Sequence, residues 1–137
     1  MRYMIIMEAS QQHYDAAAGK DTDVPTWAPD ELEAMFNFMN ELNEDLVGRG
    51  EFVDAQGLTD PAHARRVTRV DGETVVTDGP YAETKEVLAG YWIVDVDSID
   101  RATEIAAHIT TCPGPGGNGD GLPVDIRPVQ DSADLEA

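Results

Sequence analysis

The sequence has one cysteine, few basic residues and no long apolar run, and each scarcity excludes a class of protein. With Cys112 as the single thiol, neither an intramolecular disulfide nor a multi-cysteine zinc site can form. No apolar stretch approaches the roughly 20 residues of a membrane-spanning helix. The first apolar stretch is cut off at Glu8, too early for a secretory signal. These absences predict a cytoplasmic protein with no membrane contact.

Basic residues are so scarce that the charge is one-sided. The 137 residues include 9 Lys and Arg against 27 Asp and Glu, a formal net charge of −18. A chain of this charge repels phosphate backbones, which excludes nucleic acid as a partner. The acidic surface serves solubility, or adapts the chain to a salty cytoplasm in which screening weakens self-repulsion.

Metal-binding and cofactor motifs are also missing. His13, His63 and His108 are far apart and form no H-x-H or H-E-x-x-H spacing. The glycine-rich run at 114–121 lacks the Lys-Ser/Thr ending of a phosphate loop. A strand also follows this run, where a phosphate loop needs a helix. We therefore expect neither a metal nor a cofactor.

What is present predicts one α+β domain. Hydrophobic residues make up 42% of the chain, enough for one core at this length. Apolar spacing predicts strands at 2–7, 51–58, 64–70, 73–77, 87–96 and 124–129, a helix at 29–47, and a helix capped by Asp97 or Ser98 that reaches Ile109. Residues 8–28 and 112–121 are expected to be loops, and the acidic tail at 131–137 to fray.

Two of these elements carry strong local signals. Pro29 suits the first position of a helix, and an apolar stripe at three-four spacing follows it: Leu32, Met35, Phe36, Met39, Leu42 and Leu46. Such a stripe indicates a face packed on the core. Asp71-Gly72 alone separates two β-rich runs, and this pair favours a hairpin because both turn positions need positive φ.

Without the hairpin, the element order is βαββαβ, the split arrangement of ferredoxin-like domains. Both helices of this fold lie on one face of an antiparallel sheet, which leaves the other face bare. The apolar content of the strands makes a fully hydrated second face unfavourable. We expect a second copy, related by a two-fold axis, to cover it, so the sequence predicts a homodimer.

The run at 77–86, Thr-Asp-Gly-Pro-Tyr-Ala-Glu-Thr-Lys-Glu, resembles the signature of the YCII-related proteins called DGPF-domain proteins. Tyr81 stands where Phe is common. The stretches at 2–6, 71–72, 90–97 and 124–129 resemble the family in the same order. This resemblance implies one YCII-related domain over 1–130, with the ferredoxin-like units packed sheet to sheet as a dimeric α/β barrel.

Members of this family are largely uncharacterised in function. Some are linked to genes for extracytoplasmic-function sigma factors, and a related YCII protein is thought to act on a chlorinated hydroxyquinol through a His and an Asp. Relatives with that pair carry the His at the start of the first helix, whereas residues 28–32 read Ala-Pro-Asp-Glu-Leu here. Dehalogenation is therefore not carried over to this chain.

Four residues are the catalytic candidates. A turn after a strand could aim Asp78 at a pocket, with Lys85 or Glu86 near it, so that the carboxylate serves as a general base. His13 follows the first strand and is the histidine best placed to act as an acid or base. The alternative for Asp78 is structural, because an aspartate before Gly-Pro commonly caps its own turn.

Tyr81, Glu83, Arg65, Arg69 and Met7 are the candidate substrate-binding residues. On a strand Arg65 and Arg69 share one face, and guanidinium groups suit carboxylate or phosphate ligands. The alternative is that this cluster pairs with local acids such as Glu73.

Three functions remain open. The chain is a small-molecule-binding domain that acts as a cofactor-free enzyme with an Asp-centred acid/base site, a non-catalytic binding or regulatory dimer, or a purely structural homodimer. A site on a loop where two sheets meet is a usual place for a cleft, which favours a small-molecule ligand.

Overall fold

The computed structural model describes residues 1–117 and 123–131. In chain order the elements are β1 (Arg2–Ala9), α1 (Gln11–Ala17), α2 (Pro29–Gly48), β2 (Phe52–Gly57), η1 (Pro61–His63), β3 (Arg65–Val70), β4 (Glu73–Asp78), β5 (Val87–Asp95), α3 (Ile99–Ile109), η2 (Pro115–Gly117) and β6 (Val124–Pro128). No helix in these ranges is long and apolar enough to cross a bilayer. The end of the expected glycine-rich loop, 118–121, and nearly all of the expected tail, 132–137, lie outside the described residues.

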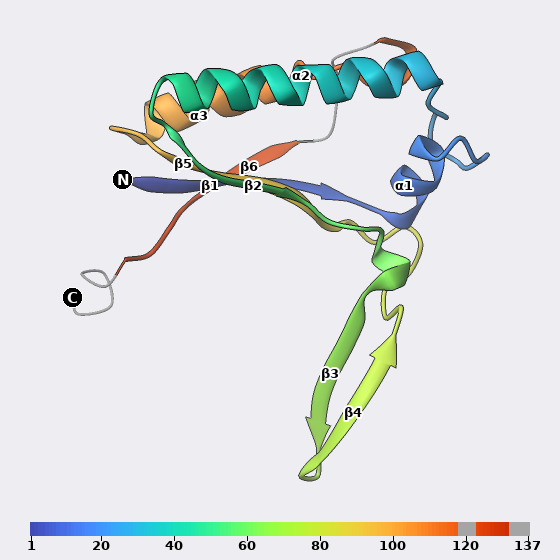
Figure 1. Cartoon of the computed structure of the whole chain (residues 1–137). Helices are drawn as coiled ribbons and strands as arrows, with labels where there is room; N and C mark the ends of the chain where they lie inside the picture. The colour runs from blue at the N-terminus through green and yellow to red at the C-terminus, as the bar shows by residue number, and fades with distance from the viewer. Residues whose placement is uncertain (118–122, 132–137) are drawn as a thin grey trace.

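Four strands form the main sheet, in the order β2-β5-β1-β6, and every neighbouring pair is antiparallel. α2 and α3 lie side by side over one face of this sheet (Figure 1). The α+β class and the ferredoxin-like order predicted from the sequence are therefore confirmed. β1 has a register shift after Met7, which lies opposite Gly90, so the strand is irregular where it runs toward α1.

The core lies between the sheet and the two long helices. Tyr3, Ile5 and Val94 point from the sheet into this layer, and alternation puts their neighbours on the opposite face. The helices contribute six buried residues: Leu42, Leu46, Ala102, Ile105, Ala106 and Ile109. The Ser98 Oγ accepts a hydrogen bond from the Arg101 N–H and caps α3, as the sequence predicts.

The expected loop at 8–28 is wrong in its first half. β1 continues to Ala9, and residues 11–17 form α1. The Ser10 Oγ accepts a hydrogen bond from the His13 N–H, while the His13 side chain accepts one from the Ser10 N–H. This reciprocal pair is a capping box with His where Glu or Gln is usual. It satisfies two backbone donors and starts a short helix that apolar periodicity alone does not reveal.

β3 and β4 form a hairpin that is a separate two-stranded sheet. Asp71 has φ 50° and Gly72 has φ 80°, the positive values that the Asp-Gly pair predicts for the turn. The hairpin projects from the main sheet on the side opposite α2 and α3 (Figure 1). We call residues 65–78 the arm.

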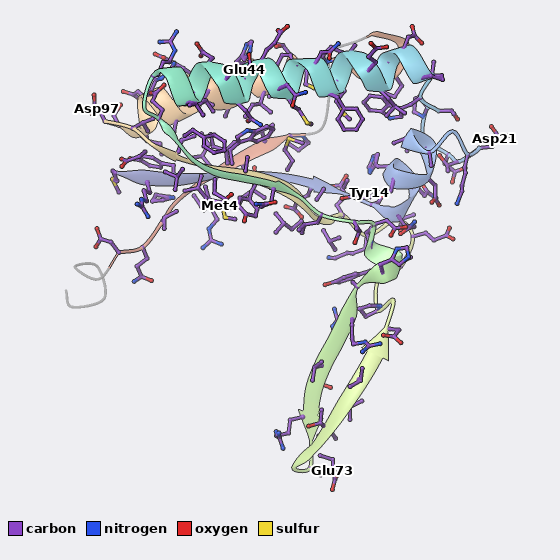
Figure 2. The ribbon with its side chains drawn as sticks, in the orientation of Figure 1. Met4, Tyr14, Asp21, Glu44, Glu73 and Asp97 are labelled. Carbon is purple, nitrogen blue, oxygen red and sulfur yellow. The ribbon has the colours of Figure 1, made fainter. Side chains whose placement is uncertain are left out.

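The face of the sheet turned away from α2 carries an apolar strip. Strand alternation and register place Met4 and Ile6 of β1 beside Ile93 and Tyr91 of β5 on this side. Figure 2 shows Met4 on the side away from the helices. Each of these four residues is only partly buried. We call this surface the open face, because no described helix covers it.

Candidate functional site

A large cavity lies between the helix-covered side of the sheet and α2. Its volume is about 1020 Å³. Six stretches of the chain line it: the end of β1 with α1, the segment that precedes α2, α2 as far as Asn43, facing residues of β2 and β5, residues 109–115 at the end of α3 and beyond it, and Val124 at the start of β6. Most of its wall is apolar, as is usual for pockets that bind small molecules.

The wall on α2 is the first half of the apolar stripe. Leu42 and Leu46, at its other end, are buried in the core. Leu32 and Met35 are only half-buried, and Phe36 is 57% exposed, although all three line the cavity. The stripe therefore divides into a part that packs on the sheet and a part that faces space the chain does not fill.

His13 gives the cavity an oriented polar group. Its Nδ1 accepts a hydrogen bond of 2.9 Å from the Ser10 N–H, so the ring proton lies on Nε2. Among the described residues Nε2 has no hydrogen-bond partner. His13 is one of the residues that line the cavity, which makes this nitrogen the candidate donor to a bound acceptor. Glu8 is the one carboxylate among the described lining residues.

Tyr14 connects α1 to the ends of two strands. Its hydroxyl donates a hydrogen bond of 2.8 Å to the Leu58 carbonyl, and the Ala89 carbonyl lies 3.4 Å away. Burial raises the pKa of the Tyr14 hydroxyl, and the nearby Asp60 charge adds to this effect. Tyr14 is therefore a neutral donor at physiological pH, and it ties α1 to the residue after β2 and to β5. Figure 2 shows Tyr14 beside α1.

A polar cluster lies on the other side of Tyr14. The Gln11 amide donates hydrogen bonds to Asp15, at 3.0 Å, and to Asp60, at 2.8 Å. His63 Nδ1 also bonds Asp60, and this bond, followed by the one from Gln11, lowers the pKa of that carboxyl. Together with Tyr14, Asp15, Asp60 and His63 line a shallow hollow of about 510 Å³. The cluster fixes α1 to the base of the arm.

Two further polar groups belong to the wall of the large cavity. The Trp92 indole N–H donates a hydrogen bond of 2.7 Å to the Asn43 Oδ1, which joins β5 to α2. Burial raises the pKa of the Cys112 thiol to about 11, so this thiol stays protonated at neutral pH. A cavity wall that is mostly apolar, with Glu8 as its one described carboxylate, suits a neutral or weakly charged organic ligand.

Within residues 1–117 and 123–131, no three His, Cys, Asp or Glu side chains are grouped as metal ligands. The cavity wall itself is poor in hard oxygen donors, with Glu8 as its only described carboxylate. Its chemistry therefore favours an organic ligand over a cation.

The match to known proteins agrees with this architecture. The family model of the YCII-related domain matches residues 1–113. The chain is a member of the YCII-related family. An uncharacterised protein of Rhizobium meliloti (strain 1021) is 31% identical over 84 residues, which cover 61% of this chain and 68% of the relative. The matched range contains every segment of the cavity wall up to Pro113, so the cavity lies largely within the YCII-related domain.

Of the candidate site residues, the YCII-related domain brings Met7 and His13 together in the cavity wall. Asp78 instead lies at the base of the arm, where its carboxylate accepts a 2.7 Å hydrogen bond from the Arg65 Nε. Both side chains of this pair are largely exposed. Arg65 thus pairs with an acid of its own hairpin, the alternative to binding an anionic ligand with this arginine.

The other candidates are exposed and lie on or after the arm. Arg69 Nη1 donates a hydrogen bond to the Gly72 carbonyl, and Arg66 stacks over Tyr81 at 5.2 Å. Glu83, Lys85 and Glu86 follow on an exposed segment, and the Gln12 N–H donates to the Glu83 carbonyl. None of these residues lines the large cavity. Their functional roles stay predictions.

Sequence reasoning missed most of the polar groups in the cavity wall. Tyr14, Asn43 and Cys112 come from three elements, and no spacing in the sequence connects them. For α1 a signal does exist, since Ser10 precedes His13 by the three residues of a capping box. A histidine at this position is unusual, which is why the pattern is easily overlooked.

Proposed function

We propose that this YCII-related domain binds a small organic molecule in the cavity beneath α2. The ligand would combine an apolar body with one hydrogen-bond acceptor, such as a carbonyl, carboxylate or phenolate oxygen. The observation that carries this proposal is the half-exposed stripe of Leu32, Met35 and Phe36 facing unfilled space of about 1020 Å³. Family membership supports, at a coarse level, a domain that binds or acts on a small molecule.

His13 would orient the acceptor. Its Nε2–H is the donor that the Ser10 cap leaves available, and the apolar surroundings would strengthen a hydrogen bond made there. To act as a general base, Nε2 would have to give up its proton and Nδ1 would have to take one. That exchange would break the bond from the Ser10 N–H. We therefore favour binding and polarisation of an oxygen over proton abstraction by His13.

Catalysis centred on Asp78 is the alternative, and a regulatory partnership with an extracytoplasmic-function sigma factor is a further one. Asp78 does not line the large cavity, and no contact of the described residues points to a sigma factor. Ligand binding, in contrast, is supported by the cavity itself. We also propose that the domain pairs with a second copy through its open face. This proposal is supported by the apolar strip of Met4, Ile6, Tyr91 and Ile93, which no described helix covers.

Leu32→Trp tests the cavity directly. The larger ring would fill space beneath α2 without adding charge, and Glu33→Trp is the matched control because Glu33 is exposed and does not line the cavity. We expect small aromatic carboxylates and phenols to raise the Tm of the wild-type chain and of Glu33→Trp, but not of folded Leu32→Trp. Equal shifts in all three proteins, or none in the wild type across the series, would contradict the proposal.

A further inference from the structure

The two strands of the arm pair with each other and with no other strand of the described residues. All twelve strand residues of β3 and β4 are exposed, and the valines are prominent, with Val67 at 62% and Val76 at 53%. An isolated two-stranded hairpin is at best marginally stable in water. Its two outer edges also leave backbone donors and acceptors unpaired. The arm thus has the properties of an element that is completed by contact outside its own chain.

The arm lies on the same side of the main sheet as the open face. Figure 1 shows it projecting away from α2 and α3, and Glu73 marks its far end in Figure 2. The open face and the arm therefore form the two sides of a corner. A body seated on the open face would lie beside the arm.

Charge distinguishes the arm from the rest of the chain. Its three arginines are balanced by Asp71, Glu73 and Asp78, so the whole net charge of −18 resides on the other residues. Arg65 and Arg69 each use only part of their donors within the arm, one toward Asp78 and the other toward the Gly72 carbonyl. The remaining donors face solvent.

The open face of a second copy offers matching acids. Register places Asp54 beside Ile93, Asp95 beside Arg2 and Asp125 beside Ile6, so three carboxylates lie around the apolar strip. Arg127 lies beside Met4 on the same face, and Asp54 and Asp95 also bond the Tyr91 hydroxyl and the Met1 amino group of their own chain. Two chains of charge −18 repel each other, and arginines placed against the partner's acids would offset part of that repulsion.

We infer that the arm of each protomer clasps a second copy of this chain, with its arginines against the aspartates at the rim of the partner's open face. This inference rests on the proposed pairing of open faces and adds a separate contact to it. The clasp would order the hairpin and contribute an attraction that salt weakens, whereas salt strengthens an association limited by like-charge repulsion.

Arg66→Gln with Arg69→Gln tests the clasp and leaves the Arg65–Asp78 pair intact. The control with the same charge change is Lys20→Gln with Arg49→Gln, two exposed residues that follow α1 and α2. Sedimentation of the full chain is expected to show a dimer Kd at least tenfold weaker for the arm variant than for the control, and a smaller weakening by salt. A Kd within twofold of the control would overturn the clasp.

Amide hydrogen exchange provides a second readout. We expect protected amides in β3 and β4 of the wild-type dimer, and loss of this protection on dilution to monomer. Fast exchange of both strands in a protein that sediments as a dimer would overturn the clasp while leaving the pairing of open faces in place. A wild-type chain that is monomeric at all concentrations would overturn the pairing and the clasp together, and would leave ligand binding in the cavity untouched.

Discussion

At position 13, a histidine occupies the place that Glu or Gln usually fills in a capping box, and the residue also lines the cavity. The two roles can be separated because glutamine retains the cap. We expect His13→Ala to lower the free energy of unfolding by about 1 kcal/mol, because it removes the acceptor of the Ser10 N–H and leaves the bond from the backbone N–H of residue 13 to Ser10 Oγ in place. His13→Gln should nearly restore stability and still bind ligand more weakly. Chemical denaturation and ligand titration measure the two effects, and equal affinity in His13→Gln and the wild type would argue against the donor role.

Asp78 is the residue at which the catalytic alternative is tested. Its pair with Arg65 is solvent-exposed, and such pairs contribute at most about 1 kcal/mol. We expect Asp78→Asn to fold normally and to bind cavity ligands with unchanged affinity, since Asp78 does not line the cavity. Glu73→Gln at the arm tip is the control for a lost charge. Loss of binding or turnover in a folded Asp78→Asn alone would restore the Asp-centred site.

At the scale of elements, one ion pair joins the first turn of α3 to the segment that follows α2. Arg101 in α3 donates two hydrogen bonds to the carboxylate of Glu51, just before β2, at 2.8 and 2.9 Å. The bond to Arg101 lowers the pKa of Glu51 below its ordinary value of 4.5. Because the folded-state pKa is the lower one, the pair stabilises the fold fully above that ordinary value.

This stabilisation should disappear as the pH falls from about 4.5 through the lowered pKa of Glu51. Arg101→Met is expected to cost roughly 2 kcal/mol at pH 7, because it leaves a half-buried carboxylate without its partner. The variant should also lose less stability than the wild type over the acid range. Arg49→Met removes an exposed pair with Asp45 and should change unfolding far less. Parallel pH profiles for Arg101→Met and the wild type would contradict this account.

Elements differ in how well the sequence predicts them. The helix at Pro29 and the turn at Asp71-Gly72 are determined by local chemistry, so their positions follow from a few residues. α1 depends on one unusual cap and on the bonds that Tyr14 and Gln11 make to residues more than 40 positions away. Such contacts exist only after folding, which is why the segment reads as a loop in the sequence.

For the whole molecule, the order of the strands follows from the order of the elements, whereas the cavity does not. Its wall joins segments from Met7 to Val124, and its volume depends on how far α2 stands from the sheet at Leu32. The apolar stripe predicts that α2 has a buried face. It does not indicate that only Leu42 and Leu46, at the far end, reach full burial.

The pairing of open faces gives a prediction at this scale. Ile93 lies in the middle of the apolar strip, and a charge there would be buried at the contact between two copies. We expect Ile93→Lys to sediment as a folded monomer at micromolar concentrations at which the wild type is a dimer. Val47→Lys, on an exposed position of α2, should leave the dimer intact. A dimeric Ile93→Lys would exclude the open face as the contact.

The single thiol in this sequence lies in the wall of the cavity, half-buried between the end of α3 and the glycine-rich segment. With a pKa of about 11, it reacts slowly at neutral pH, and a ligand that covers this part of the wall would slow it further. Cys112 can therefore report whether the cavity holds a ligand. The alkylation rate of Cys112 should fall in proportion to the fraction of molecules that hold a ligand, so affinities are measurable without any added label.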